Sequence, residues 1–560
     1  MTRHVVLDTD FGDGARFAAA RARRRAPLHY LAMTPHAHDA QLIGDPQLRA
    51  LWPPDVPGFH RIVLDDGRVT LDLLVGEVAA VLPQVTARVD HFDVGAAAMA
   101  DTRLVRTLAR LAAPGATLRA RAPGELLVWA LAAAGFACRV AQEGDDIDAV
   151  FRPRRPPALP LAPPPPVRQA VVIGAGLAGS AVCQRLCAQG WDVTLIERHA
   201  QPATEASGNL AGIFMPLLSK DDNIPTRLAR AAYLFALREW RRLGGVGTAF
   251  KGAACGVLQL ARDERHARVQ RDVLAHWDYP SGYARWADAA EAGALMNAPT
   301  PHGGWLFGQG GWVRPSSLCA AMLDACGDRL QRVFCSEAVT LHRADGQATW
   351  QVRAADCAVL AQAPTVILAN GAGAVRIAQA AQLPLQALRG QVTHLAADSA
   401  PQLPLVVCRE AYVTPPSDGV VCAGATYDND LDPALRASSQ QENLARLAEI
   451  VPGERVAALA ATAPLAGRVG FRCAAPDRLP LAGALPDYPA AGRLEHLRDV
   501  PRHPGLYGLL GYASRGLIWA PLMAELLVSH LEHMAPPIEA SLVDALDPGR
   551  FLLKQRRRAQ

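Results

Sequence analysis

Short apolar runs alternate with amphipathic stretches over residues 1–152. Strand-like runs occupy residues 5–8, 28–33, 61–64, 69–74 and 116–120, and helix-like periodicity covers residues 14–24 and 102–112. Because strands that alternate with helices are typical of layered α/β proteins, this pattern predicts a largely parallel sheet with helices packed on it.

A second pattern begins at residue 169, where a strand runs directly into a glycine turn. The elements predicted from here on are strands at 169–173 and 193–196, helices at 181–189, 225–243 and 520–534, and β-rich stretches at 406–413 and 419–425. The mixture predicts a second α/β region joined to a mixed β-sheet.

Prolines separate the two regions, at residues 153, 156, 157, 160 and 163–166. Proline fixes φ and lacks an amide donor, so this stretch is expected to be a semi-rigid spacer rather than part of a sheet or helix. A chain of 560 residues is also too long for a single core. We therefore predict a first domain at 1–152, a Pro-rich linker at 153–168 and a second domain at 169–560.

Charge and cysteine content limit the class of protein. A formal net charge of +4 is small for this length, and the basic run at residues 554–558 is expected to be a solvated, frayed end, although such a run can also contact RNA. Eleven cysteines occur without a CxxC pair, which favours reduced thiols, and Cys183 and Cys187 are expected to be packed on a helix rather than to bind metal. The N-terminus does not resemble a signal peptide, and no apolar run is long enough to span a bilayer. These features predict a soluble, cytoplasmic protein.

Residues 174–179 form a GxGxxG turn between an apolar strand and an amphipathic helix. Gly174 permits the tight turn, Gly176 lets the backbone approach a pyrophosphate, and Gly179 lets the helix pack closely on the strand. The next strand ends at Glu197, near the distance at which an acidic side chain meets ribose hydroxyls. Since a helix N-terminus also attracts phosphate, the segment predicts a dinucleotide site.

Further glycine-containing stretches favour FAD over NAD. Residues 205–220 follow the turn with glycine, serine and lysine, residues 366–373 form a strand that enters a small-residue turn, and residues 511–517 open the last long helix. Three separated glycine sites suit an extended FAD better than an NAD held by one βαβ unit.

Several blocks resemble a known group of enzymes. They are Ala-Ser-Gly-Asn at 206–209, Ser-Lys-Asp-Asp-Asn at 219–223, residues 388–392, 472–480 and 514–517, and the closing block at 544–551. At these blocks the chain resembles the glycine oxidase and D-amino-acid oxidase superfamily, and within it the MnmC family of bifunctional enzymes that modify the tRNA wobble uridine. The blocks at 219–223 and 544–551 are far more specific than the glycine turn.

The resemblance implies a fold and a reaction for residues 169–560. It implies a Rossmann-type FAD domain with a mixed β-sheet substrate domain, which oxidises the carboxymethylaminomethyl group of the wobble uridine. That substituent is an N-alkylated glycine, so its oxidation releases glyoxylate and leaves an aminomethyl group. Arg472 stands where such proteins hold the substrate carboxylate with a bidentate guanidinium; a structural salt bridge is the alternative role.

The motifs together define the expected FAD contacts. The residues are Gly174, Ala175, Gly176, Ala178, Gly179, Glu197, Arg198, Ser207, Gly208, Asn209, Gly212, Asn370, Gly371, Gly511, Ser514, Arg515 and Gly516.

For residues 1–152 the resemblance implies a Rossmann-like methyltransferase domain that uses S-adenosylmethionine to methylate the new amine. Asp8, Gly12 and Gly14 resemble the glycine loop that holds this cofactor, and Asp93 stands near the position of the catalytic aspartate. The chain departs from the family in two ways: the segment that usually precedes the glycine loop is absent, and residues 90–97 replace an Asp-Gly-Phe-Ala-Pro motif. The domain is therefore expected either to methylate or to be a decayed domain kept for folding or tRNA contact.

Three functions remain open at this point. The first is the modification of tRNA, with tRNA as the partner and no obligate protein partner. The second is oxidation of a free small amine such as glycine or sarcosine by the flavin domain. The third is a tRNA-binding or scaffolding protein with vestigial sites, which leaves the glycine sites and Arg472 without an explanation.

Overall fold

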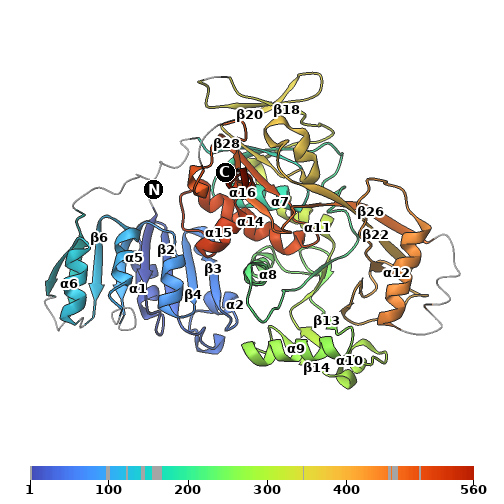
Figure 1. Cartoon of the computed structure of the whole chain (residues 1–560), viewed down its shortest axis with the longest axis horizontal. Coiled ribbons are helices and arrows are strands. Elements are labelled where there is room, and N and C mark those ends of the chain that lie inside the picture. The colour runs from blue at the N-terminus through green and yellow to red at the C-terminus, as the bar shows by residue number, and fades with distance from the viewer. Residues whose placement is uncertain are drawn as a thin grey trace. The chain divides into compact units, whose positions relative to one another are not determined.

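The computed structural model of the chain describes residues 3–95, 101–121, 124–140, 146–153, 167–344, 346–451, 456, 465–490 and 494–559. The chain forms two compact units (Figure 1). The first comprises Met1–Pro166 and Val528–Val543, and the second comprises Val167–Leu527 and Asp544–Gln560. Val528–Val543 lies within the predicted second domain, so the compact units and the predicted domains differ by this segment.

The first unit is built on an eight-stranded sheet, in the order β3-β4-β2-β1-β5-β6-β8-β7. Its strands are β1 (His4–Asp8), β2 (Leu28–Thr34), β3 (Gly58–Leu64), β4 (Val69–Val75), β5 (Val89–Val94), β6 (Ala112–Ala120), β7 (Phe136–Val140) and β8 (Ile147–Phe151). The five central strands, from β4 to β6, are parallel, whereas β3, β8 and β7 join by antiparallel pairing. This confirms the predicted largely parallel sheet.

Helices cover the two faces of this sheet unequally. The described helices are α1 (Ala15–Arg23), α2 (Pro46–Leu51), α3 (Val78–Val81), α5 (Leu104–Leu111) and α6 (Glu125–Ala133). One face buries side chains from all eight strands against α3, α5 and α6. The opposite core, with Phe17 of α1 and Leu48 of α2, contains residues up to Val75 and none from β5 to β8.

The second unit contains a six-stranded sheet in the order β17-β10-β9-β21-β28-β27. Its strands are β9 (Gln169–Ile173), β10 (Asp192–Ile196), β17 (Leu330–Val333), β21 (Thr365–Leu368), β27 (Leu481–Pro486) and β28 (Arg502–Leu510). All neighbours are parallel except β27 and β28. The helix α7 (Leu177–Ala188) follows β9, and α14 (Gly516–Leu531) follows β28.

A second, mixed sheet of eight strands completes this unit, in the order β14-β15-β13-β23-β24-β25-β22-β26. Its strands are β13 (Val257–Leu260), β14 (Arg285–Ala287), β15 (Gly304–Phe307), β22 (Gln386–Ala396), β23 (Val406–Cys408), β24 (Tyr412–Val413), β25 (Val420–Gly424) and β26 (Ala466–Ala474). Two three-stranded sheets are made by β11 (Gly212–Phe214), β16 (Gly311–Val313) and β12 (Gly252–Ala253), and by β18 (Thr340–His342), β19 (Trp350–Arg353) and β20 (Val359–Ala363). The remaining helices are α8 (Ile224–Arg242), α9 (Glu264–Trp277), α10 (Ala289–Met296), α11 (Pro315–Asp324), α12 (Ala437–Ile450), α15 (Ala540–Leu546) and α16 (Arg550–Ala559).

The α/β fold class predicted from the sequence is confirmed, with two local differences. The stretch at 406–413 is two short antiparallel strands, β23 and β24, because the chain turns between them. The basic run at 554–558 is not frayed but lies in α16, although most of its side chains are exposed. All eleven cysteines are free, and Cys183 and Cys187 are buried on α7. In the part of the chain that the structure describes, no helix is long and apolar enough to cross a bilayer.

Candidate functional site

The glycine turn after β9 is shaped by close backbone packing. Gly174 has a φ of +103°, and a Cβ there would lie 2.8 Å from the Ala369 carbonyl oxygen. A Cβ on Gly179 would overlap the Gly174 carbonyl oxygen. Both positions therefore exclude a larger side chain, and the start of α7 can approach β9 closely.

Two side chains brace this turn from outside. Ala175 donates its backbone N–H to the Glu197 Oε2 at 2.8 Å, and Leu177 donates to the Ser207 Oγ at 3.1 Å. Glu197 also accepts from the backbone N–H of His199 at 3.0 Å and is 9% exposed. The carboxylate and the hydroxyl predicted to contact FAD thus also hold the turn and the helix N-terminus in place.

The three glycine sites predicted from separate parts of the sequence lie together. Gly174 contacts the turn at Asn370, at the end of β21. Gly212 packs against Leu517, and a Cβ on Gly516 would lie 3.3 Å from the Leu177 side chain. The close packing brings the starts of α7 and α14 and the end of β21 to one region, as the FAD prediction requires.

The residues present fit an FAD. The carboxyl ends of the parallel strands β9 and β21 meet here, where strand order places ligands in this type of sheet. The Asn370 Oδ1 is buried and has no hydrogen-bond partner among the described residues, so it is a polar atom suited to a ligand donor. Gly371 has a φ of +56° and Gly511 a φ of +73°, which are backbone conformations that favour glycine.

Not every predicted FAD contact faces this region through its side chain. The Arg198 guanidinium pairs with the Glu205 carboxylate and is 37% exposed, so it lies at the margin. Ala175 and Ala178 contribute to the turn and to α7, and Ser514 is exposed at the loop that precedes α14. The individual contacts of these residues with FAD stay predictions.

Arg468 is a residue that sequence reasoning missed. Its guanidinium donates to the Asn209 Oδ1 at 3.1 Å and to the Thr204 carbonyl at 2.7 Å, and it would overlap a Cβ on Gly208. The predicted Ser-Gly-Asn block is therefore braced by β26. The sequence feature that could have indicated Arg468 is its position four residues before Arg472. Side chains separated by an even number of residues lie on the same face of a strand.

Arg472 lies on β26, opposite Leu388 of β22. Its guanidinium stacks on the Tyr427 ring at 4.1 Å and donates to the Thr426 carbonyl at 3.1 Å, above the bare backbone of Gly390. It makes no ion pair with any residue that the structure describes, so nothing here supports the alternative of a structural salt bridge. The planar group is held in one orientation, while its charge is left without a counterion.

The loop that carries Arg515 is tied by a backbone hydrogen bond to β26, beside Arg472. Ala513 donates to the Cys473 carbonyl at 2.7 Å, which ties the loop before α14 to β26. Within the described ranges Arg515 has no carboxylate partner, and burial lowers the pKa of its guanidinium. Tyr427 interacts electrostatically with Arg515 and stacks on Arg472. Two cations without a carboxylate partner therefore lie near the exposed Tyr427 ring.

Replacing Ser207 by alanine should weaken FAD binding about fivefold, because loss of one hydrogen bond to the helix N-terminus costs about 1 kcal/mol. Titration of the apoprotein with FAD, followed by flavin fluorescence, measures the change. The matched control is Thr194→Ala on β10, whose hydroxyl bonds the Gln331 side chain instead. Equal dissociation constants for the wild type and Ser207→Ala would contradict the bracing role.

A second candidate site lies in the first unit, where the strand order reverses. β1 is flanked by β2 on one side and by β5 on the other, and Asp8 is paired in register with Asp93. Thr9 links the two strand ends, because its N–H donates to the Asp93 carbonyl and its hydroxyl accepts from Gly95. The two predicted acids are therefore neighbours at a carboxyl edge of the kind that binds nucleotides.

The glycine loop after β1 is ordered around Asp8. Gly12 and Gly14 have φ angles of +57° and +79°, and Gly14 precedes α1. Asp8 is buried and accepts from the Arg16 guanidinium at 2.8 and 2.9 Å and from the Tyr30 hydroxyl at 2.7 Å. Burial raises the pKa of Asp8, although these bonds act against the rise.

Asp93 differs from Asp8 in its surroundings. Burial alone would raise its pKa, but His91, whose Nε2 lies 3.6 Å from the Asp93 Oδ2, helps to bring the pKa below its ordinary value. Asp93 is therefore a carboxylate at neutral pH. Of the divergent stretch at 90–97, residues 96 and 97 lie outside the described part of the chain.

Known proteins resemble the chain over nearly its whole length. Residues 169–530 match the DAO family model, described as FAD dependent oxidoreductase. The bifunctional tRNA 5-methylaminomethyl-2-thiouridine biosynthesis protein MnmC of Burkholderia thailandensis is 41% identical, over 99% of this chain and 91% of the relative. The protein of the same name from Azoarcus sp. is 42% identical, with the same shares covered.

Solved structures share the fold of the second unit. Glycine oxidase from Geobacillus kaustophilus aligns with a TM-score of 0.55 and 20% identity, over 69% of this chain and 99% of that one. Iminodiacetate oxidase from Chelativorans sp. aligns with a TM-score of 0.53 and 24% identity, over 65% and 95%. The family model and the near full-length relatives together establish that this chain belongs to the MnmC family of bifunctional proteins, with FAD as the cofactor of its DAO-type oxidoreductase part.

Proposed function

We propose that the chain removes the carboxymethyl group from 5-carboxymethylaminomethyl-(2-thio)uridine in tRNA and then methylates the resulting amine. The name of its relatives supports the pathway, and the observation that carries the oxidative step is the pair of uncompensated cations, Arg472 on β26 of the mixed sheet and Arg515 in the loop before α14. The carboxymethylaminomethyl group supplies the carboxylate that these cations lack. The reaction on tRNA also supports action in the cytoplasm.

Each side chain has a distinct task in the oxidative step. Arg472 binds the carboxylate through its planar fork, and the ring of Tyr427 keeps that fork from rotating. FAD, when bound, would supply the acceptor for the hydride that leaves the methylene carbon of the substrate. Two cations beside the secondary amine disfavour its protonated form, which keeps the nitrogen lone pair available when the carbon–nitrogen double bond forms. Water then hydrolyses the imine, which releases glyoxylate and leaves aminomethyluridine.

The FAD is held, in this proposal, by the predicted residues of the glycine turn, by Glu197 and by the block that Arg468 braces. Glu197 already accepts two backbone N–H groups, and each carboxylate oxygen has a second lone pair for a ribose hydroxyl. The proposed domains are residues 1–152 and 169–560, joined by the Pro-rich linker at 153–168.

The methyl transfer is assigned to the first unit. S-adenosylmethionine is proposed to lie against Asp8, Gly12 and Gly14, at the carboxyl edge shared by β1 and β5. Asp93, as a carboxylate beside this edge, is suited to accept a proton from the aminomethyl group before it attacks the methyl donor. Calorimetric titration with S-adenosylmethionine tests this half: saturable binding that Asp8→Asn weakens is expected, and no heat of binding would overturn it.

The oxidative half is tested by offering two substrates to the purified holoprotein. Glyoxylate should appear in proportion to carboxymethylaminomethyl-tRNA, and aminomethyluridine should appear in the digested tRNA. Free glycine at the same concentration should give little glyoxylate. Glyoxylate from glycine with the tRNA untouched would instead favour a free-amine oxidase and would overturn the proposal.

A further inference from the structure

Half of one sheet face in the first unit is exposed and polar. In β5, β6, β8 and β7, residues that face the core, such as Phe92, Leu118 and Phe136, alternate with residues that face outward, most of which are polar. A doubly wound sheet normally carries helices on both faces, yet no residue of these strands joins the core formed with α1 and α2. The alternation is typical of a sheet face that is solvated.

The outward side chains form a cross-strand row of alternating charge. Asp93 lies opposite Arg119, Arg119 opposite Asp148, and Asp148 opposite Arg139. Opposite charges in register stabilise neighbouring strands by a few tenths of a kcal/mol each in water. An apolar covering segment would leave this row desolvated, so the face suits a polar and hydrated partner.

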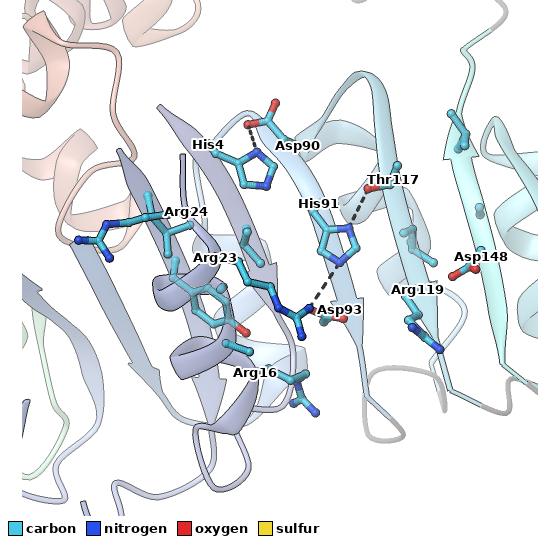
Figure 2. A pocket seen from close by; sticks show the side chains of 18 of the residues that line it. His4, Arg16, Arg23, Arg24, Asp90, His91, Asp93, Thr117, Arg119 and Asp148 are labelled. Atoms are coloured by element: carbon cyan, nitrogen blue, oxygen red, sulfur yellow. Dashed lines mark hydrogen bonds and ion pairs between the residues drawn. The ribbon is translucent and has the colours of Figure 1, made fainter. Parts of the chain in front are cut away.

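Positive charge prevails where this face meets α1. The two form an open basin of about 1680 Å³, lined by nine arginines and four aspartates. Figure 2 shows Arg16, Arg23, His91 and Arg119 on the same side of the sheet, from α1 and from neighbouring strands. Arg16 and Arg24 are paired with Asp8 and Asp65. Five exposed lining arginines make no ion pair with any described residue: Arg23, Arg25, Arg121, Arg139 and Arg152.

We propose that this surface, the arginine basin, docks the phosphate backbone of the tRNA. The proposal rests on the proposed function, which makes tRNA the substrate, and adds the surface that holds it. Four strands spaced about 4.8 Å apart span about 15 Å, enough for several phosphates of one RNA strand. Separate arginine forks spread over such a width suit a chain of phosphates better than one small anion.

The test compares two variants of the full-length holoprotein that lose the same charge. The basin variant carries Arg23→Gln, Arg121→Gln and Arg139→Gln. The control carries Arg106→Gln on α5 and Arg265→Gln and Arg268→Gln on α9, which are also exposed. Filter binding of carboxymethylaminomethyl-tRNA is measured over a series of salt concentrations. Because Arg139 belongs to the charged row, a double variant, Arg23→Gln with Arg121→Gln, is measured as well.

The basin variant should bind tRNA at least about tenfold more weakly at about 0.1 M salt, and its log–log salt slope should be smaller by about 2. The double variant should show part of both effects, and the control should stay within about twofold of the wild type. Wild-type affinity in the basin and double variants, as expected if an acidic protein segment occupies the basin, would overturn the proposal. So would equal losses in basin variant and control.

The same proteins separate this proposal from the proposed function. Glyoxylate released from tRNA by the wild type tests the function alone. If the wild type binds tRNA through the basin but releases no glyoxylate, the docking surface stands and the function fails. If the wild type is active and the basin variants bind normally, the docking surface fails and the function stands.

Discussion

Replacing Arg472 by lysine should leave FAD bound and lower kcat/KM for carboxymethylaminomethyl-tRNA by about 10²–10³. Lysine keeps the charge but cannot form two parallel hydrogen bonds to a carboxylate, and it does not stack on Tyr427 as a planar group. Loss of such a charge-assisted contact costs about 3–4 kcal/mol when it orients the reacting carbon. Steady-state glyoxylate release, with the flavin content checked by absorbance, measures the effect.

Arg468 supplies a matched control on the same strand. Its guanidinium holds the loop at Thr204 and Asn209 and not the region of Tyr427. Arg468→Lys should therefore weaken FAD retention, while the fully FAD-loaded variant turns over at nearly the wild-type rate. Wild-type kinetics for Arg472→Lys would remove its role in binding the carboxylate. Loss of FAD from Arg472→Lys would assign it a structural role instead.

Local chemistry made the FAD turn predictable from sequence. The motif consists of a strand, three glycines and a following helix within a short stretch of chain. The roles of Gly174, Gly179 and Glu197 could therefore be predicted from spacing alone. The structure shows the same glycines in close backbone contacts. The prediction of a second glycine site at Asn370 also relied on a short motif, and the parallel pairing of β9 with β21 explains why the two sites meet.

Contacts between distant segments could not be predicted in the same way. Arg468 reaches the Asn209 block only because β26 and the loop after Glu205 are brought together by the fold, and no local pattern encodes that distance. The tie between Ala513 and Cys473 likewise depends on the pairing of the loop with β26. In the first unit, the alternation of residues along β6 predicted a strand. Which face of that strand is exposed could not be predicted, because it depends on where the helices pack.

The segment Val528–Val543 is the clearest case of a contact hidden from sequence. Arg61 of β3 is fully buried, and its guanidinium donates to the Ser529 hydroxyl at 2.7 Å and to the Ala535 carbonyl at 2.6 Å. The segment therefore completes the first unit across more than four hundred residues of chain. A proline-rich linker marks a change of unit in the sequence, but a returning segment leaves no such mark.

Asp72→Asn should destabilise the first unit by about 3–5 kcal/mol, because it removes a carboxylate that pairs with the buried Arg61 guanidinium. Arg61 and Asp72 face each other across β3 and β4, with hydrogen bonds of 2.8 and 2.7 Å, and Asp72 also bonds the His29 Nε2 at 2.7 Å. Urea unfolding followed by circular dichroism measures the loss, while flavin absorbance reports the second unit separately. The control is Asp72→Leu with Arg61→Met, which removes both charges and should be less damaging than either single change.

The same cluster should make the first unit acid-sensitive in two steps. Burial lowers the pKa of His29, so below about pH 6.5 the unfolded chain takes up a proton that the folded chain refuses, and stability falls. Burial alone would raise the pKa of Asp72, but Arg61 and His29 together bring it well below its ordinary value, so stability falls again as the pH drops below about 4. Asp72→Asn removes the second step because it has no carboxylate to titrate. Unfolding midpoints for the first unit that stay constant between pH 7 and pH 4 would contradict the buried neutral histidine, and midpoints that do not fall further below pH 4 would contradict the paired aspartate.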